Sequence, residues 1–383
     1  MLKIGVIGIG NTGNQIASLA LEKLGIPVLA INSSEKDLET IPDGVEKRLI
    51  SDEDGLSQGA GKNRSLAKKY LKASVMDILI NDEKIRKMIA GLDVCFIVSS
   101  TGGGTGSGTA PLMAGIIDSS FRNVKVILVG VLPVNGEALS AHVNTLEYLT
   151  ELYSSLPNQT YILYDNDSLS HLPSYQIMET VNEEVVKDMN VIRCRYNYTT
   201  RYDSIDEEDM KRLISFPGRI IIARLEDMSE KNAEDQKIEK MLIDKLKDNC
   251  HVEIQRDRKL LASGIITNLS RNLSEQFDNH IPAVREFIGD PIHDFNHIYI
   301  NTDRKMENNV FMILAGLTPV NDKIHKISDR IEDIQEKQKQ MEEENALNEI
   351  DTSALSDAID KQDVRKSSAK EVNLGDIFSR FGA

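Results

Sequence analysis

Three short segments of this chain contain residues whose types and spacing are suited to chemistry. Two are rich in glycine: GIGNTGN at residues 8–14 and TGGGTGSG at residues 101–108. The third, residues 203–209, has five acidic side chains in seven positions. Glycine-rich turns between a strand and a helix are suited to binding phosphate groups through backbone N–H groups. Closely spaced carboxylates are suited to orienting a water molecule or to complementing a helix N-terminus.

The two glycine-rich segments, here called the first and second glycine loops, each follow an apolar run of strand length. KIGVIGI (residues 3–9) leads into the first loop, LDVCFIVS precedes the second, and a helical apolar pattern follows each. In that setting the helix N-terminus adds partial positive charge, and glycine lets phosphate oxygens approach the backbone. Because a flexible Gly/Ser linker would not lie between a buried strand and an apolar helix, we predict two phosphate-binding loops.

The first glycine loop is also compatible with a nicotinamide nucleotide. GIGNTG matches the GxGxxG fingerprint of dinucleotide-binding proteins, so an NAD(P)-dependent oxidoreductase is an open alternative. Such a site usually has an acidic residue at the end of the second strand. In this sequence the second strand ends in Ala-Ile-Asn-Ser, and the first acidic residue after it is Glu35. A Walker A loop is absent, because Asn63 follows the Gly-Lys of GAGKN where Ser or Thr is required.

The order of apolar runs predicts an α/β fold in two parts. Continuous apolar runs alternate with amphipathic helices through residue 166, which is typical of a parallel sheet covered on both faces. Beyond a long helical pattern at residues 175–189, further strand-like runs indicate a smaller α/β unit, with one helix near residues 234–246. These runs are GRIIIARL, LLASGIITNL, HIYINT and NNVFMILAGL.

Composition narrows the class of protein. The chain has 383 residues, a net charge of −15 and a pI near 5.0, so direct binding to DNA phosphates is not expected. There is no apolar run long enough to span a membrane, and we expect a cytoplasmic protein that does not bind membranes. The three cysteines are far apart in the sequence, which disfavours a disulfide framework or a structural zinc site.

Six motifs, in the same order along residues 1–320, resemble those of the tubulin/FtsZ superfamily. The second glycine loop contains GGGTGSG, the signature of tubulin and FtsZ, and GNTGNQIA resembles the first loop of tubulin. AINSSEKDL, QGAGKN (residues 58–63, the QGAGKN loop), LPVNGEAL (residues 132–139, the LPVNGEAL loop) and YDND (residues 164–167) resemble the family's remaining nucleotide loops. The resemblance implies a tubulin/FtsZ-like fold and a GTPase that polymerises head to tail, with GTP/GDP and Mg²⁺ as cofactors. The ligands of Mg²⁺ are not identified.

The resemblance also implies a set of nucleotide-binding residues. Those implied to surround the phosphates are Gly10, Asn11, Thr12, Gly13, Asn14, Ala60, Gly61, Lys62, Gly103, Gly104, Thr105 and Gly106. Those implied to hold the ribose and guanine are Glu137, Asn166, Met178 and Asn182. Met178 stands where the family usually has an aromatic ring, and its thioether can still cover a purine face.

The acidic run has two interpretations. By itself it is typical of a solvated helix start whose carboxylates complement the helix dipole. The family has NxDxxD at this place, and Asp206 and Asp209 match its spacing, with Ser204 in place of the asparagine. The resemblance implies that both aspartates are catalytic and reach the γ-phosphate held by the neighbouring subunit, so that the active site is completed by polymerisation.

The predicted organisation has five parts. They are a GTP-binding domain (1–173), a connecting helix (174–200), a C-terminal activation domain (201–320), a C-terminal helix (321–347) and a disordered, partner-binding tail (348–383). The motifs look closest to the TubZ branch, which implies plasmid or phage DNA segregation through a DNA-binding adaptor held by the tail. A divergent FtsZ-like cell-division GTPase is the alternative. The tail ends in NLGDIFSRFGA, with apolar residues at helical spacing.

Overall fold

The structure is a computed structural model that describes residues 1–194, 205–229, 237–247, 249–254, 260–301 and 308–347. The chain divides into two compact units, residues 1–331 and residues 332–383. The described part of the second unit, residues 332–347, is helical. The tail predicted to bind a partner, residues 348–383, lies outside the described residues.

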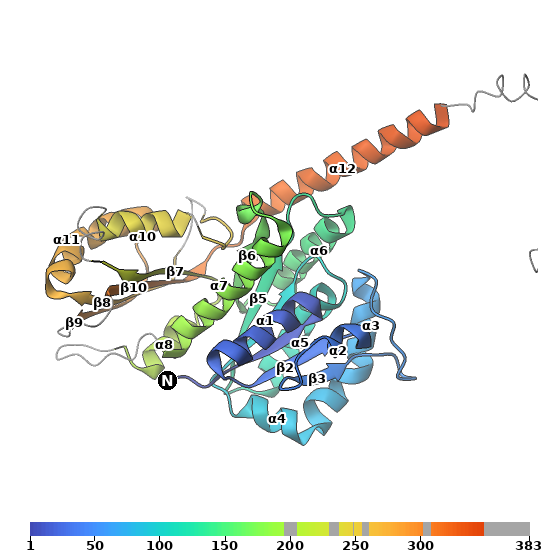
Figure 1. Ribbon diagram of the computed structural model, residues 1–383, viewed down its shortest axis with the longest axis horizontal. Coiled ribbons are helices and arrows are strands. Elements are labelled where there is room, and N and C mark those ends of the chain that lie inside the picture. The colour runs from blue at the N-terminus through green and yellow to red at the C-terminus, as the bar shows by residue number, and fades with distance from the viewer. Residues whose placement is uncertain (195–204, 230–236, 248, 255–259, 302–307, 348–383) are drawn as a thin grey trace, which may run out of the picture. The chain divides into compact units, whose positions relative to one another are not determined.

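The elements of the described residues alternate between strands and helices through most of the chain (Figure 1). The strands are β1 Ile4–Ile9, β2 Val28–Asn32, β3 Glu46–Leu49, β4 Val94–Ser100, β5 Lys125–Leu132, β6 Thr160–Asp165, β7 Gly218–Met228, β8 Ala262–Ser270, β9 His293–Asn301 and β10 Asn308–Leu317. The α-helices are α1 Gly10–Leu24, α2 Glu35–Glu39, α3 Arg64–Met76, α4 Glu83–Ala90, α5 Thr105–Ser120, α6 Leu139–Ser155, α7 Ser174–Cys194, α8 Glu207–Leu213, α10 Ile238–Lys247, α11 Arg271–Ile288 and α12 Asn321–Leu347. A π-helical turn, η1 Asp77–Asn81, follows α3, and a 3₁₀ turn, η2 Asn166–Leu169, follows β6.

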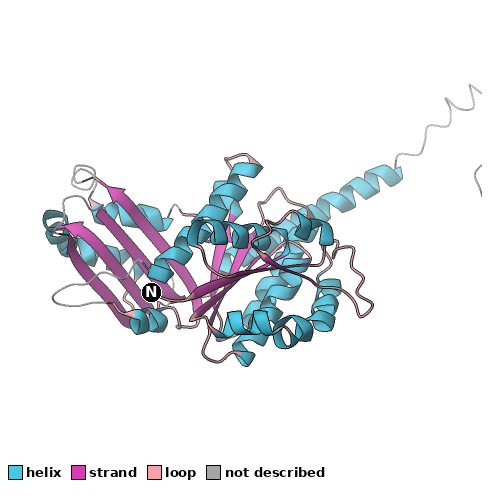
Figure 2. Ribbon diagram, turned by 60° about the horizontal axis from the view of Figure 1, so that its bottom comes forward, coloured by secondary structure: helices cyan, strands magenta, loops and turns pink. Residues whose placement is uncertain are grey.

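The strands of the described residues form one ten-stranded sheet, ordered β3-β2-β1-β4-β5-β6-β7-β10-β8-β9. The first six strands are parallel, whereas β10 runs antiparallel to both β7 and β8. Figure 2 shows the strands side by side across the molecule. Only two residue pairs, Thr160–Gly218 and Tyr161–Arg219, join β6 to β7. The α/β fold predicted from the sequence is confirmed.

Helices cover both faces of the parallel half of the sheet. On one face, side chains such as Val6 and Val98 pack with α1 and α7, and on the other, Ile7 and Ile97 pack with α3, α5 and α6. Neighbouring residues of β1 therefore enter different cores, which is why the strand sequences are continuously apolar. A third core lies between α10, α11 and the strands β7, β8 and β10.

Helix α7 packs against both halves of the sheet. Its apolar residues Ile177, Val181, Val185 and Met189 belong to the same buried cluster as residues of β1, β6, β7 and β10. The helix also lies beside α1 (Figure 1). It therefore connects the parallel half of the sheet with the β7–β10 half.

A buried ionic cluster anchors α7 to β6 and β7. Asp188 accepts hydrogen bonds from Arg224 Nε at 2.7 Å and from the Tyr164 hydroxyl at 2.8 Å, and it lies 3.0 Å from His251 Nε2. Burial alone would raise the pKa of Asp188, but His251, Arg224 and Tyr164 outweigh burial and hold this pKa below its ordinary value. The carboxylate is therefore charged and fully partnered inside the protein.

We predict that Asp188→Asn lowers the free energy of unfolding by about 1–3 kcal/mol, because it removes the buried carboxylate shared by Arg224 Nε, His251 and the Tyr164 hydroxyl, while Arg224 keeps its ion pairs with Glu184 and Glu226. Urea denaturation followed by circular dichroism measures this change. The control is Glu183→Gln on the same helix, where the side chain is 58% exposed and the loss should stay below about 0.5 kcal/mol. Equal losses in both variants would contradict a structural role for the cluster.

Candidate functional site

The two glycine loops meet at the carboxyl ends of the adjacent strands β1 and β4. Gly10 has a φ of +73°, and a Cβ atom placed on it would lie 3.2 Å from the backbone nitrogen of Gly106. A Cβ on Gly13 would overlap the carbonyl oxygen of Val98. Glycine is required at both positions because the backbones touch. In open α/β sheets, ligands bind in the crevice at this edge, where strand order reverses.

The second glycine loop has a tight side and an open side. A Cβ on Gly104 would lie 2.7 Å from Lys62 Cα, so this residue packs against the QGAGKN loop. A Cβ on Gly103 would meet no atom within 4 Å. The space beside Gly103 is therefore free for a ligand group that approaches the backbone.

Helices α1 and α5 begin at these loops without a side-chain cap. Neither Ile9 nor Gly104, the residues that precede the two helices, accepts a capping hydrogen bond through its side chain. The first N–H groups of a helix need partners outside the helix, and an anion can supply them. Two adjacent uncapped helix starts favour a negatively charged ligand such as a phosphate chain.

A cavity of about 320 Å³ adjoins the glycine loops and gathers residues from α1, the LPVNGEAL loop, η2 and α7. Five predicted binding residues line it: Thr12, Glu137, Asn166, Met178 and Asn182. The Oδ1 atom of Asn166 is buried and has no hydrogen-bond partner among the described residues. Because such an atom is costly to leave unpaired, it fits a ligand that donates a hydrogen bond there.

Further side chains of the cavity were not predicted from the sequence. Gln15 and Ser100 lie near the glycine loops, whereas Ser174 lies at the start of α7. Gln15 is part of the GNQI segment and Ser100 ends β4 directly before the second glycine loop. Their positions beside recognised motifs could have identified both residues as candidates for the cavity.

Asn14, which was predicted to bind the nucleotide, does not line the cavity. It is fully buried, and its amide exchanges two hydrogen bonds with the backbone of Ile31, at 3.2 and 3.3 Å. These bonds tie the start of α1 to the end of β2. Asn14 therefore positions the first glycine loop, while the neighbouring Asn11 is exposed.

Ser33 supports both the second glycine loop and the QGAGKN loop. Its hydroxyl lies 2.7 Å from the Thr105 hydroxyl, and its carbonyl accepts a hydrogen bond from Gly59 N at 2.9 Å. Ser33 itself is fully buried. It lies in the AINSS segment, which the sequence analysis recognised without assigning a role to this serine.

The LPVNGEAL loop is fixed by its own residues and by η2. Glu137 accepts a hydrogen bond from Val134 N at 3.2 Å and returns one from its backbone N–H at 3.0 Å. The carboxylate of Asp167 accepts two hydrogen bonds from Asn135, from its backbone N–H at 3.1 Å and from its amide at 2.6 Å. The predicted ribose loop and the YDND segment therefore form one connected structure.

The first turns of α12 contact the same two loops. Lys323 Nζ lies 2.8 Å from Asp165 Oδ2 and 3.7 Å from Asp167 Oδ2, while Arg330 donates to the Asn135 carbonyl at 3.2 Å. The Lys323 and Asp165 side chains are only 11% and 12% exposed. Burial raises the pKa of Asp165, and the nearby Lys323 offsets part of that rise.

Asp206 and Asp209 cap helix α8 and do not line the cavity. Asp206 accepts hydrogen bonds from the backbone nitrogens of Glu208 and Asp209 at 2.8 and 2.9 Å, and Asp209 accepts one from Asp206 N at 3.5 Å. This is a capping box, the arrangement expected for a carboxylate-rich helix start. Ser204 lies outside the described residues.

The described residues contain no group of three or more His, Cys, Asp or Glu side chains arranged to hold a metal ion. Mg²⁺ in phosphate-binding proteins commonly binds through substrate phosphates and water, with few protein ligands. In the same part of the chain, no helix is both long and apolar enough to cross a bilayer.

Residues 3–173, which contain both glycine loops and most of the cavity, match the GTPase domain of the Tubulin/FtsZ family. This segment is similar to the GTPase domain of that family. Among curated relatives, TubZ of Clostridium botulinum C phage is 21% identical over 392 residues, covering 99% of each chain. CetZ of Pyrococcus horikoshii is 27% identical over 191 residues, and FtsZ 1 of Thermococcus kodakarensis is 26% identical over 242 residues.

The extent of these matches differs. The alignment with CetZ covers 48% of this chain and only half of the relative, and the alignment with FtsZ 1 covers 60% of each. The solved structure of tail-truncated TubZ from Clostridium botulinum phage c-st has a TM-score of 0.69 and 22% identity, covering 88% of this chain and 98% of its own. A GTPγS-form protofilament of TubZ from Bacillus thuringiensis serovar israelensis has a TM-score of 0.68 and 21% identity, covering 89% and 94%. At these identities the structural likeness shows a shared fold.

We predict that Lys323→Ala destabilises the protein by about 3–5 kcal/mol at neutral pH, because the buried Asp165 carboxylate loses its cation. The loss should shrink as pH approaches 3.8, the ordinary pKa of Asp, because the variant binds a proton at Asp165 more readily when folded than when unfolded. Denaturation midpoints of variant and wild type at both pH values measure this. Lys326→Ala, at an exposed lysine one turn further along α12, is the control, and a pH-independent loss in Lys323→Ala would contradict the prediction.

Proposed function

We propose that this chain binds and hydrolyses GTP and assembles head to tail into filaments, in the manner of a TubZ-like cytoskeletal GTPase. One observation supports this above all: Thr12, Glu137, Asn166 and Asn182 line a single cavity beside two uncapped glycine loops, and both loops lie in the segment similar to the Tubulin/FtsZ GTPase domain. The cavity has polar side chains for a base and a sugar, and the loops have backbone N–H groups for phosphates. A cytoplasmic location is part of the same proposal.

In this proposal the ligand groups divide among three parts of the site. Asn166 and Asn182 hydrogen-bond the guanine edge, Met178 covers the base, and Glu137 binds the ribose hydroxyls. Residues 10–13 and 103–106 hold the phosphates through backbone N–H groups, and residues 60–62 reach the γ-phosphate. Bound Mg²⁺ supplies positive charge at the phosphates. The protein's contribution is to orient the phosphate chain and stabilise its charge.

The hydrolytic carboxylates are proposed to come from a second copy of the chain. Asp206 and Asp209 lie on α8, away from the cavity of their own subunit, which fits a role at a contact between subunits. A protofilament of TubZ with GTPγS and a two-stranded TubZ filament are among the similar solved structures. Head-to-tail contact would bring the carboxylates to the γ-phosphate, where they orient the attacking water. Assembly and hydrolysis would then be coupled.

We predict that Asp206→Asn binds GTP and assembles but hydrolyses GTP at least about a hundredfold more slowly. Asparagine caps a helix about as well as aspartate, so α8 keeps its start while one carboxylate is lost. The measurements are phosphate release and GTP-dependent sedimentation across protein concentrations. Glu208→Gln, in the same helix turn, is the control and should hydrolyse GTP like the wild type.

Two results would contradict these assignments separately. A wild-type rate in Asp206→Asn would show that this carboxylate acts only as a helix cap. A wild-type protein whose rate per molecule is independent of concentration, and which never sediments with GTP, would contradict the shared active site. Identifying guanine or nicotinamide in the nucleotide that co-purifies would decide between a GTPase and the oxidoreductase alternative.

We further propose that the filaments segregate plasmid or phage DNA through a DNA-binding adaptor held by residues 348–383. Two observations support this choice: the TubZ relative from a phage matches along 99% of the chain, and the net charge of −15 disfavours direct DNA contact. The alternative is an FtsZ-like cell-division protein, since the match to FtsZ 1 covers 60% of the chain.

We predict that deleting residues 348–383 leaves GTP-dependent sedimentation intact but abolishes recruitment of DNA to filaments. The measurement is co-sedimentation of a labelled plasmid from the source replicon with wild-type or truncated filaments, with and without the DNA-binding proteins that the replicon encodes. DNA recruited by the full chain alone would contradict an adaptor. Recovery of a division protein on the tail, with no DNA under any condition, would favour the FtsZ-like alternative.

A further inference from the structure

The QGAGKN loop has a backbone that requires support from its surroundings. Gly59, Gly61 and Lys62 all have positive φ angles, of 91°, 54° and 62°. Lysine pays a steric cost of about 1–2 kcal/mol in this left-handed region, which glycine avoids. Within the loop, Asn63 N donates to the Ala60 carbonyl at 2.8 Å. This bond closes the turn that contains Lys62, and a contact from outside the loop adds to its support.

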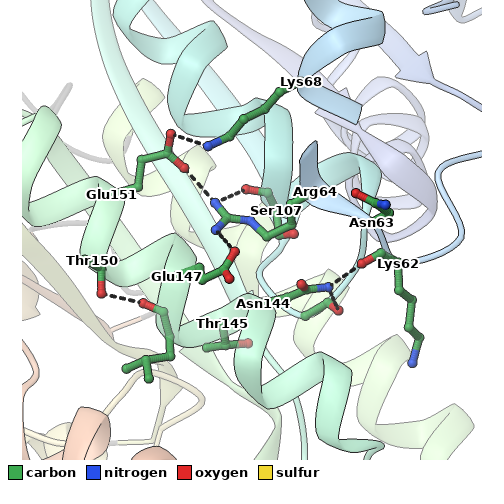
Figure 3. Close-up of polar contacts among 12 residues, drawn as sticks. Lys62, Asn63, Arg64, Lys68, Ser107, Asn144, Thr145, Glu147, Thr150 and Glu151 are labelled. Carbon is green, nitrogen blue, oxygen red and sulfur yellow. Dashed lines mark hydrogen bonds and ion pairs between the residues drawn. The ribbon is translucent and has the colours of Figure 1, made fainter. Parts of the chain in front are cut away.

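A single side chain on α6 makes that contact. The Nδ2 group of Asn144 donates to the carbonyl oxygen of Lys62 at 3.0 Å, and to those of Gly102 and Gly103 at 3.2 and 3.0 Å. Figure 3 shows the Asn144 amide turned toward Lys62. Because all three partners are carbonyl oxygens, the amide nitrogen must face them. Asn144 is only 7% exposed, so water does not readily replace these bonds.

The direction of these carbonyls sets the direction of the neighbouring N–H groups. In a trans peptide the N–H of the next residue points opposite to the carbonyl. With the carbonyls of Gly102 and Gly103 held toward Asn144, the N–H groups of Gly103 and Gly104 point to the opposite side. That orientation leaves them available to a ligand that enters the open space beside Gly103.

The surroundings of Asn144 are held together by a network of hydrogen bonds and ion pairs around Arg64. One turn along α6, Glu147 accepts a hydrogen bond from Arg64 at 2.9 Å, and Glu151 accepts one from Arg64 at 2.6 Å. Arg64 follows the QGAGKN loop and also donates to the Ser107 carbonyl in α5 at 3.0 Å (Figure 3). Helix α6 is thereby fixed to the ends of both loops, and Asn144 projects from it between them.

We propose that Asn144 is a positioning residue that holds the QGAGKN loop and the second glycine loop at the spacing required for the γ-phosphate of GTP. Because Asn144 acts here on the GTP site proposed above, its role rests on that proposed function. The γ-phosphate is the ligand group that would lie between both loops, whereas GDP would need mainly the second glycine loop. Loss of Asn144 therefore affects GTP more than GDP.

The test uses two variants. Asn144→Ala removes the amide donor. Asn144→Asp keeps the shape of the side chain but replaces the amide NH₂ with a carboxylate oxygen, which can only accept hydrogen bonds and therefore faces the carbonyl oxygens unfavourably. Both variants should weaken GTPγS binding by about tenfold and weaken GDP binding clearly less, as measured by competition with a fluorescent nucleotide in Mg²⁺. Thr150→Asp adds one negative charge at an exposed position of α6 and should leave both affinities unchanged.

A second measurement does not depend on nucleotide. Hydrogen exchange of the nucleotide-free proteins should be faster at residues 59–63 in both Asn144 variants than in the wild type and Thr150→Asp. Unchanged exchange at these residues would overturn the positioning role, whatever the protein binds. Equal losses of GTPγS and GDP affinity, or a loss in Asn144→Asp alone, would overturn the γ-phosphate role. Absence of guanine-nucleotide binding in the wild type would instead overturn the proposed function.

Discussion

The close approach of two backbones at the ends of β1 and β4 is the constraint on which the site depends. Gly13 touches the Val98 carbonyl and Gly10 faces Gly106, so the glycine loops interlock. Any side chain there would separate α1 from α5 and move their uncapped starts apart. The LPVNGEAL loop, η2 and α7 then complete a cavity beside this junction. The phosphate-binding potential of the site follows from backbone contact more than from any charged side chain.

The sequence predicted strands β1, β2, β4, β5 and β6 because they are buried on both faces, but it did not predict the half-buried edge strand β3 or helices α3 and α4. Residues such as Ile7 and Val98 make each strand continuously apolar, and the intervening helices carry clear stripes. Helix α11 was missed, because Pro282 interrupts its pattern and its sequence lies between two strand-like runs. Helices α1 and α5 begin earlier than their apolar spacing indicated, since glycine residues form their first turns.

For the site, motifs identified the loops but not the residues that hold them in place. Gly103, Glu137 and Asn166 lie in recognisable segments, whereas Asn144 lies on α6 among its buried residues, where His142 and Thr145 are also polar. A polar side chain on the buried side of a helix could have marked this residue as a candidate. Its three carbonyl partners come from two segments that are distant in the sequence. Contacts of that kind depend on tertiary structure and cannot be read from local spacing.

The narrow join between β6 and β7 has a mechanical consequence. Only two residue pairs join β6, in the parallel half of the sheet, to β7, in the mixed half. By comparison, seven residue pairs join β4 to β5, and seven join β10 to β8. A twisting load on the molecule would therefore be absorbed first at Thr160 and Tyr161, where few interstrand bonds oppose shear. Helix α7 packs against strands on both sides of this join. The two halves of the sheet would therefore twist relative to each other about the axis of α7.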